Sequence, residues 1–402
     1  MSGGAAVAAP APRAGRRVMI SCGEASGDLY AGALTASLRA AEPDVAVFGF
    51  GGARLSGAGA TLLGDYGRFA VTGLVEAISV LPRSWTMLRA LREAARLRRP
   101  DVFVAIDFPD FNFRLLPAMR QLGVPVVYYV SPQLWAWRPK RIEFLRRYVD
   151  RMLVIFPFEV EVYERAGVPV EFVGHPLVDL IPAPQPRGPW LRSHGLDPDR
   201  PVVALLPGSR PNEVRRILPV IAEACRLLTR QVAGVQFLVA RAPALPDDLF
   251  APIAGVRQAK VVADATDAVL GAADAAVTAS GTATVQTALH GRPMVIVYRL
   301  SPMTHAIGRS FIRVPHVGMV NLVAGRSVVP ELIQSAFTPA GVAAEVASLL
   351  TDEARASVMR EDLAQVRAVL GGAGATARAA QAVLCVAGVK TPWGPGSGSP
   401  VH

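Results

Sequence analysis

Acidic, basic and hydroxyl side chains follow apolar runs of the sequence at three positions that could carry chemistry. Asp107 directly follows the run Val102–Ile106, and Arg210 and Ser280 each come shortly after another such run. A carboxylate at the carboxyl end of a strand can accept a proton from a substrate hydroxyl. An arginine fork and a turn of small hydroxyl residues are instead suited to phosphate oxygens. The sequence therefore predicts proton abstraction from one ligand and binding of a second, phosphorylated ligand.

The expected phosphate site combines a helix start with a cation. The segment Ser280-Gly281-Thr282 follows a predicted strand and begins a helix, so its backbone N–H groups can bind an anion. Each contact with a helix end contributes only roughly 0.3–1 kcal/mol when exposed, so a diphosphate also needs a positive charge. Arg210, in the turn Gly208-Ser209-Arg210, is the best candidate. The alternative is that the hydroxyl of Ser280 or Thr282 only caps the helix and that Arg210 pairs with Glu213. Because the helix start and the arginine occur in the same domain, we favour a bound ligand.

Other positions in the first half of the chain have both a functional and a structural interpretation. Asp110 fits the N-cap of a helix better than a catalytic role, whereas a catalytic role is favoured for Asp107. Trp135 and Trp137 could line a sugar or acyl site, and a rigid packed loop explains them nearly as well. His175 could be a general base or a hydrogen-bonded histidine of a hinge.

Short apolar runs alternate with helical patterns along the chain, which is typical of parallel sheets covered by helices on both faces. The proline-rich stretch 182–201 cannot sustain a helix or a central strand, so we predict that it is a linker. We therefore predict α/β architecture with two doubly wound, Rossmann-like domains facing a cleft. They cover 17–181 and 202–388, the second with the terminal helices, and disordered tails cover 1–16 and 389–402. Ligands of such sheets bind beyond the carboxyl ends of the strands, where the candidate residues lie.

Composition limits the class of protein. The chain has 402 residues, of which 51% are hydrophobic and 18% charged, so it can form two or three domains with sizeable cores. No apolar stretch is long enough for a transmembrane helix, and no secretory signal is recognised, so we expect a cytoplasmic protein. The net charge of +10 suits an anionic membrane surface or a phosphorylated substrate. Nucleic acid is the least favoured partner, because no RNA-recognition or helix-turn-helix pattern occurs.

The stretch 71–83 is apolar on more than one face and precedes a basic segment. It could rest in a membrane interface, although a buried core helix is the commoner explanation of so short a stretch. The three cysteines lie far apart and the six histidines form no ligand pair, so neither a disulfide framework nor a metal site is indicated. There is no GxxxxGK[ST] motif, and 49–52 misses the GxGxxG spacing, so neither ATP hydrolysis nor hydride transfer is supported.

Seven motifs, in order over residues 17 to 335, together resemble the lipid-A-disaccharide synthase family. They are Gly23-Glu24-Ala25-Ser26-Gly27-Asp28, Ile106-Asp107-Phe108-Pro109-Asp110-Phe111-Asn112, Ser131-Pro132-Gln133-Leu134-Trp135-Ala136-Trp137-Arg138, Gly174-His175-Pro176, Leu206-Pro207-Gly208-Ser209-Arg210, Ala279-Ser280-Gly281-Thr282-Ala283 and Asn321-Leu322-Val323-Ala324-Gly325-Arg326. The resemblance implies a GT-B glycosyltransferase with the acceptor in its first domain and a UDP-sugar in its second. It implies that UDP-2,3-diacylglucosamine is joined to 2,3-diacylglucosamine 1-phosphate with inversion, at the inner face of the cytoplasmic membrane. It also implies that no metal or other cofactor is needed, and it leaves the oligomeric state open.

By position, the resemblance implies that Asp107 is the base for the acceptor 6-hydroxyl and that Arg210 and the turn 280–282 bind the diphosphate. Asn321 and Arg326 match a motif near the donor. The residues expected on the acceptor side of the cleft are Gly23, Glu24, Ser26, Gly27, Asp28, Trp135, Trp137 and His175.

Gln286 departs from the family, whose members carry Glu at this position. A glutamine has one carbonyl acceptor where a carboxylate has two anionic oxygens, so one contact with the ribose hydroxyls is in doubt. On this ground we expect weaker UDP binding, which Gln286→Glu should strengthen.

Two other functions are weighed against the transferase. One is a different GT-B enzyme of UDP-sugars, such as an epimerase or a transferase to another lipid, and the other is a noncatalytic protein that binds sugar nucleotide or anionic lipid.

Overall fold

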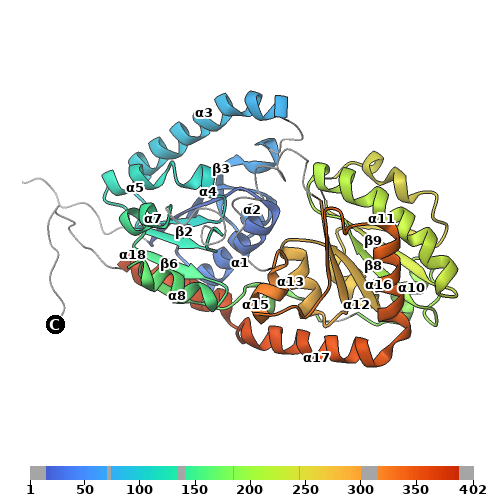
Figure 1. The fold of residues 1–402 in the computed structure, drawn as a ribbon. Helices are drawn as coiled ribbons and strands as arrows, with labels where there is room; N and C mark the ends of the chain where they lie inside the picture. The colour runs from blue at the N-terminus through green and yellow to red at the C-terminus, as the bar shows by residue number, and fades with distance from the viewer. Residues whose placement is uncertain are drawn as a thin grey trace, which may run out of the picture.

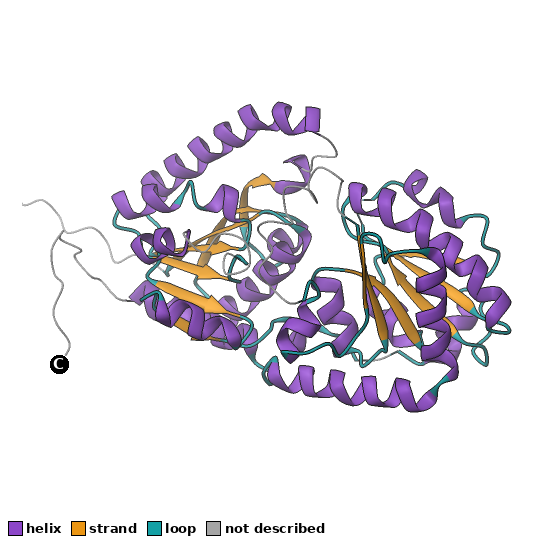
Figure 2. Ribbon diagram, in the orientation of Figure 1, coloured by secondary structure: helices purple, strands orange, loops and turns teal. Residues whose placement is uncertain are grey.

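The computed structural model describes residues 15–69, 74–133, 141–183, 185–243, 245–299 and 316–388, and the side chains of 68–83 are likewise outside the description. Two α/β domains lie side by side, each a parallel sheet with helices on its two faces (Figure 1, Figure 2). This is the predicted fold class. None of the helices in the described ranges is long and apolar enough to cross a bilayer.

The first domain is built on a seven-stranded parallel sheet of order β3-β2-β1-β4-β5-β6-β7. Its strands are β1 (Arg17–Cys22), β2 (Ala46–Gly51), β3 (Thr61–Asp65), β4 (Val102–Ile106), β5 (Val126–Tyr129), β6 (Arg151–Val154) and β7 (Val170–Phe172). Successive side chains of a strand point to opposite faces, so Val18 and Ile20 join one hydrophobic core and Met19 joins the other. Burial on both faces explains why the central strands read as continuous apolar runs.

Long and short helices cover this sheet. They are α1 (Ala25–Ala41), α2 (Ala53–Gly57), the 3₁₀ helix η1 (Tyr66–Phe69), α3 (Leu74–Arg98), α4 (Pro109–Asn112), α5 (Leu116–Gln121), α7 (Ile142–Tyr148), α8 (Phe158–Arg165) and α9 (Leu177–Leu180). The apolar stretch 71–83 lies at the start of α3, where 71–73 are outside the described ranges.

The second domain has a six-stranded parallel sheet of order β10-β9-β8-β11-β12-β13. Its strands are β8 (Val202–Leu206), β9 (Gln236–Arg241), β10 (Ala259–Ala263), β11 (Ala275–Ala279), β12 (Met294–Tyr298) and β13 (Glu331–Ile333). The helices that follow the first domain are α10 (Arg187–Ser193), α11 (Pro211–Gln231), η3 (Asp247–Ile253), α12 (Thr266–Ala272), α13 (Thr282–Leu289), α15 (Met319–Ala324), α16 (Pro339–Thr351), α17 (Glu353–Val369) and α18 (Ala375–Gly388).

Both sheets reverse their strand order beside their first strand. In the first sheet the reversal falls between β1 and β4, and in the second between β8 and β11. A crevice opens outside the carboxyl ends of the strands at such a switch point, and ligands of doubly wound folds bind there. The turns after these four strands begin at residues 23, 107, 207 and 280, so they carry most of the predicted site residues.

The proline-rich stretch 182–201 contains the helix α10, contrary to our prediction that its prolines exclude one. Pro189 lies in the first turn of α10, where a missing backbone N–H breaks no helical hydrogen bond. Arg187 attaches this helix to the second domain by hydrogen bonds to Asp274 Oδ2 at 2.7 Å and to the Ala272 carbonyl at 2.9 Å.

The last helix returns to the first domain, whereas the sequence analysis assigned it to the second. α17 runs along the second domain, and α18 then packs against α1 and the sheet of the first domain (Figure 1). Asp179 binds the start of α18 by accepting hydrogen bonds from the Gly374 and Thr376 N–H groups at 2.7 and 2.8 Å. Small buried residues, among them Ala379 and Ala380, allow this close approach.

Candidate functional site

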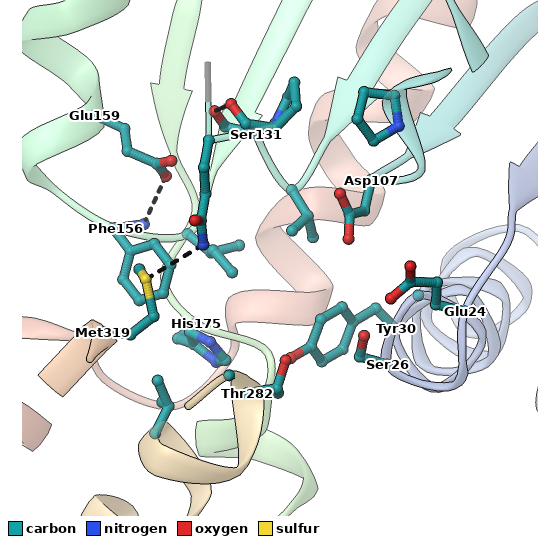
Figure 3. Close-up of a pocket in the computed structure, with 18 of the residues that line it drawn as sticks. Glu24, Ser26, Tyr30, Asp107, Ser131, Phe156, Glu159, His175, Thr282 and Met319 are labelled. Carbon is teal, nitrogen blue, oxygen red and sulfur yellow. Dashed lines mark hydrogen bonds between the residues drawn. The ribbon is translucent and has the colours of Figure 1, made fainter. Parts of the chain in front are cut away.

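A cavity of about 550 Å³ lies between the two domains, at the switch points of both sheets (Figure 3). The predicted residues that line it are Glu24, Ser26, Gly27, Asp107, His175, Arg210, Gly281 and Thr282. The first five come from the first domain and the last three from the second. The structure therefore brings the candidate base, the candidate cation and the helix start to one cavity.

Asp107 is the first residue after β4, and its backbone is held in an unusual conformation. Its φ is 44°, and the next residue, Phe108, has a φ of 49°. Left-handed backbone at non-glycine residues costs of order 1–3 kcal/mol, so surrounding contacts must enforce it. The Asp107 N–H donates to the Tyr129 carbonyl at 3.1 Å, while its own carbonyl accepts from Tyr128 Oη at 2.7 Å and Asn112 Nδ2 at 2.8 Å. These contacts orient the carboxylate into the cavity.

A buried polar pair supports this turn from below. Ser21 Oγ donates to Asn112 Oδ1 at 2.7 Å, and both side chains are fully buried. Because Asn112 also donates to the Asp107 carbonyl, the end of β1 and the turn after β4 are joined through one amide. Asp110 is not the N-cap that we predicted: Phe108 occupies that position, and Asp110 lies in the first turn of α4, where it forms an ion pair with Arg141 at 3.0 Å.

Burial raises the pKa of Asp107 to about 6, and the nearby charge of Glu24 contributes to the rise. A backbone hydrogen bond from Phe108 and the charge of Arg210 oppose it. The carboxylate is therefore ionised at neutral pH but is a stronger base than an exposed aspartate. A general base works best when its pKa lies near the operating pH, so Asp107 has the electrostatics of a base.

Arg210 connects the domains across the cavity. One of its terminal nitrogens donates to Glu24 Oε2 at 2.6 Å, and the other to Glu213 Oε1 at 3.1 Å. The pairing with Glu213 that we considered as an alternative thus exists, together with a second carboxylate from the first domain. Gly208 and Ser209 belong to the same turn but do not line the cavity; Gly208 has a φ of 126° and a Cβ there would lie 2.8 Å from Glu213.

The start of α13 has no side-chain cap. Gly281 occupies the N-cap with a φ of 144°, so neither Ser280 nor Thr282 caps the helix as the alternative interpretation held. Ser280 Oγ instead donates to the Val317 carbonyl at 3.2 Å. The helix start faces the cavity through Gly281 and Thr282 and can bind an anion there.

His175 lines the cavity and is buried against the rings of Tyr30 and Phe156. Its Nδ1 accepts from the Leu177 N–H at 3.2 Å, which assigns the proton of the neutral ring to Nε2. Burial lowers the pKa of His175 to about 3, so the ring is uncharged at neutral pH. A ring in this state cannot accept a proton at Nε2, which disfavours the general-base role that we considered.

Two predicted residues have structural roles. The Asp28 carboxylate is buried and accepts hydrogen bonds from the backbone of Gly52, Arg54 and Leu55 at 2.7, 2.9 and 3.1 Å, so it binds the start of α2. Asn321 is fully buried, and its Oδ1 accepts from the Val328 and Val329 N–H groups at 2.8 and 3.0 Å. Neither side chain lines the cavity.

Other predicted residues lie away from the cavity. Arg326 forms an exposed pair with Asp362 at 2.5 Å, Gln286 lies one helical turn beyond Thr282, and Gly23 packs against the ring of Phe108. Trp135 and Trp137 lie outside the described residues.

Sequence reasoning missed Tyr30, which connects the two domains beside Arg210. Tyr30 lies one turn after Ser26 on α1, and its side chain extends toward Thr282 of the second domain (Figure 3). The spacing of four residues from Ser26 was the signal that could have identified it. Met319 and Gln133 meet across the same cavity, with Gln133 Nε2 3.4 Å from Met319 Sδ.

Among the described residues, no group of three or more His, Cys, Asp or Glu side chains could hold a metal ion. Asp107, Arg210 and the open start of α13 lie around a single cavity, which is also lined by Glu24, Asp110, Arg141 and Glu159. Such a site can deprotonate one ligand while it binds a phosphorylated group of another.

Comparison with known proteins identifies relatives of this chain. The family model for lipid-A-disaccharide synthetase matches residues 18–386. The chain is 44% identical over 370 residues to the lipid-A-disaccharide synthase of Myxococcus xanthus, covering 92% of this chain and 97% of that protein. It is 43% identical over 377 residues to the Geobacter metallireducens enzyme of the same name, with coverage of 93% and 98%.

Solved structures with a similar fold are more distant in sequence. A calicheamicin glycosyltransferase is 18% identical with a TM-score of 0.61, and the match covers 94% of this chain and 100% of that one. A UDP-GlcNAc 2-epimerase from Neisseria meningitidis bound to UDP-GlcNAc is 11% identical with a TM-score of 0.64, covering 92% and 100%. At these identities the likeness establishes a shared two-domain fold.

Proposed function

The chain belongs to the lipid-A-disaccharide synthase family, and we propose that the cavity between its domains is the active site. The protein is a GT-B glycosyltransferase that uses a UDP-sugar to make the disaccharide of lipid A. We further propose UDP-2,3-diacylglucosamine as the donor and 2,3-diacylglucosamine 1-phosphate as the acceptor. The observation that carries the site assignment is that Asp107 and Arg210, from different domains, face one cavity closely enough for Arg210 to affect the pKa of Asp107.

Asp107 is the proposed base. Its carboxylate accepts the proton of the acceptor 6-hydroxyl while that oxygen forms a bond to the anomeric carbon of the donor. The bond from this carbon to the diphosphate breaks at the same time, and UDP leaves with the bonding electrons. A positioned base contributes typically ~10²–10⁴-fold to such a step.

Arg210 and the start of α13 are the proposed stabilisers of the leaving diphosphate. Negative charge develops on the phosphate oxygens as the bond breaks, and fixed donors aimed at that charge lower the barrier. Arg210 already binds two carboxylates, so a diphosphate must compete with Glu24 for its guanidinium group. His175 Nε2–H supplies a neutral donor on the other side of the cavity.

We place the working enzyme at the inner face of the cytoplasmic membrane, as a peripheral protein. Both proposed substrates carry acyl chains, and the net charge of +10 favours a surface of anionic lipids. The apolar stretch 71–83 at the start of α3 is the proposed contact.

A turnover assay tests the proposal. Purified protein is mixed with both proposed substrates in detergent with a chelator, and UDP and disaccharide are followed by mass spectrometry. Disaccharide with stoichiometric UDP, lost in Asp107→Asn, is the expected result. Release of UDP without disaccharide would contradict the acceptor assignment, and UDP binding with no turnover would contradict catalysis.

A further inference from the structure

The first domain contributes one arginine to the cavity wall. Among the described residues that line the cavity, Arg141 and Arg210 are the two lysine or arginine side chains, and only Arg141 comes from the first domain. Arg210 already binds Glu24 and Glu213 and is the cation proposed for the diphosphate of the donor. Arg141 has no part in the chemistry proposed so far. Its side chain is 36% exposed, so a ligand in the cavity can reach it.

The guanidinium group of Arg141 is oriented by two neighbours and keeps further donors. Its Nη1 donates to Asp110 Oδ1 at 3.0 Å, and its Cζ lies 5.8 Å from the centroid of the Phe113 ring. Phe113 in turn stacks on Phe144 of α7, with 5.3 Å between the ring centroids. Within the described ranges, no acceptor is recorded for Arg141 Nε or Nη2. Because a guanidinium has five N–H donors in a planar fork, the group is held in place with donors to spare.

The ion pair between Arg141 and Asp110 is weak enough to admit a second anion. The Asp110 side chain is 78% exposed, and ion pairs of such exposed carboxylates are weak in water. A phosphate monoester carries about two negative charges and three acceptor oxygens, and arginine binds phosphate oxygens with two parallel hydrogen bonds. Arg141 is therefore available to a phosphorylated ligand.

Arg141 also lies at the end of the sheet that carries the proposed base. Its partner Asp110 follows Asp107 by three residues, in the first turn of α4, and both carboxylates line the cavity. In a glucosamine 1-phosphate unit, C1 carries the phosphate, C5 carries the hydroxymethyl group, and the ring oxygen joins these two carbons. The phosphate and the 6-hydroxyl therefore lie along one edge of the sugar. A cation that binds the phosphate must then lie near the base that accepts the hydroxyl proton.

We propose that Arg141 binds the 1-phosphate of the acceptor and selects the phosphorylated sugar, a proposal that rests on the acceptor and the base proposed above. Asp107 and Arg141 then hold the two functional groups of one sugar edge. The monophosphate of the acceptor and the diphosphate of the donor are bound by different arginines, Arg141 and Arg210, from different domains. Arg141 determines specificity and takes no part in making or breaking bonds.

Steady-state kinetics with two acceptors tests the proposal. The acceptors are 2,3-diacylglucosamine 1-phosphate and the same sugar without the phosphate, with UDP-2,3-diacylglucosamine as the donor in detergent. The unmodified protein should have a kcat/KM about 10- to 100-fold higher for the phosphorylated acceptor, the effect of a charge-assisted hydrogen bond. In Arg141→Gln this preference should disappear through a higher KM for the phosphorylated acceptor, with the other acceptor used as before. Arg141→Lys keeps the charge without the fork and should retain a smaller preference.

Two control variants separate phosphate binding from a structural role. Arg146→Gln removes an arginine of α7 that pairs with the exposed Glu143 and does not line the cavity, so it should behave as the unmodified protein. Asp110→Asn breaks the ion pair from its other side but leaves the guanidinium group of Arg141 in place. This variant should keep the preference for the phosphorylated acceptor.

Several outcomes would overturn the assignment. Equal use of both acceptors by the unmodified protein would show that no side chain recognises the phosphate. If Arg141→Gln lowered kcat/KM equally for both acceptors, or if Asp110→Asn lost the preference to the same extent, Arg141 would only connect α7 to α4. If Arg141→Gln did not fold, as judged by thermal unfolding, an unchanged preference in Arg141→Lys would contradict the proposal. Absence of disaccharide with either acceptor in the unmodified protein would instead overturn the proposed reaction, and this assignment with it.

Discussion

Glu24 and Arg210, which belong to different domains, form an ion pair at 2.6 Å across the cavity. The side chains are 39% and 58% exposed, and ion pairs this exposed contribute only about 0–1 kcal/mol to stability. The pair matters instead for function. Glu24 binds Arg210, the residue that we propose binds the diphosphate, and the charge of Glu24 contributes to the raised pKa of Asp107.

Glu24→Gln should therefore strengthen UDP binding. The variant removes the carboxylate that competes for Arg210, and a gain of about twofold to fivefold corresponds to the energy of an exposed ion pair. Calorimetric titration with UDP at low and at physiological salt measures the gain, which should shrink as salt screens the competing pair. Weaker UDP binding in Glu24→Gln would indicate that Glu24 orients Arg210 for the phosphate.

The rate should fall as Asp107 becomes protonated. With a pKa raised to about 6, the base is ionised above that pH and lost below it, so kcat/KM should decline toward acid with a midpoint near pH 6. In Glu24→Gln this midpoint should move to lower pH, because one cause of the raised pKa is gone. A pH profile with the same midpoint in both proteins would contradict the influence of Glu24 on the base.

Asp107→Asn should lower turnover by about 10²–10⁴-fold and at the same time stabilise the protein at pH 8. The raised pKa means that the folded state disfavours the charged carboxylate. This cost is complete above about pH 6, and it disappears below the unfolded value of 3.8. Thermal unfolding should show a higher Tm for the variant at pH 8 and a smaller difference at pH 4. The exposed Asp199→Asn is the matched control, and a lower Tm of Asp107→Asn at pH 8 would contradict the assignment.

Two variants of His175 should show whether this residue acts as a hydrogen-bond donor or as a general base. His175→Phe keeps the ring that contacts Tyr30 and Phe156 but has no donor, whereas His175→Gln keeps an N–H donor. We expect turnover to fall more in His175→Phe, and the acid limb of the pH profile to stay in place in both. Loss of that limb in either variant would make His175 the titrating base.

Much of the fold could be predicted from the sequence because buried parallel strands leave a strong signal. The continuous apolar run Val102–Ile106 is β4, with the predicted ends. The edge strands β3 and β13 were missed, since their side chains are only partly buried and show neither a full apolar run nor a regular alternation. Helix α10 was missed because proline is tolerated in a first turn, a distinction that composition does not reveal.

The site was predictable where chemistry and strand ends coincide, as at Asp107 and Arg210. The sequence did not distinguish polar residues that face the cavity from polar residues that only bind the backbone of a neighbouring element. The same motif contains Glu24, which faces the cavity, and Asp28, which binds the backbone of α2. Only the position of α2 in space distinguishes the two carboxylates. The pairing of Gln286 with Asp267 joins different helices and has no local pattern.

The return of α18 to α1 has a consequence for biosynthesis. All seven strands of the first sheet are complete at residue 172, but the helix that covers part of this domain begins at Ala375. Because chains are synthesised from the amino terminus, the first domain leaves the ribosome with an apolar face of α1 uncovered. It reaches its final packing only after the second domain has been made. A chain that ends before α18 should therefore lose solubility through its amino-terminal half, far from the site of truncation.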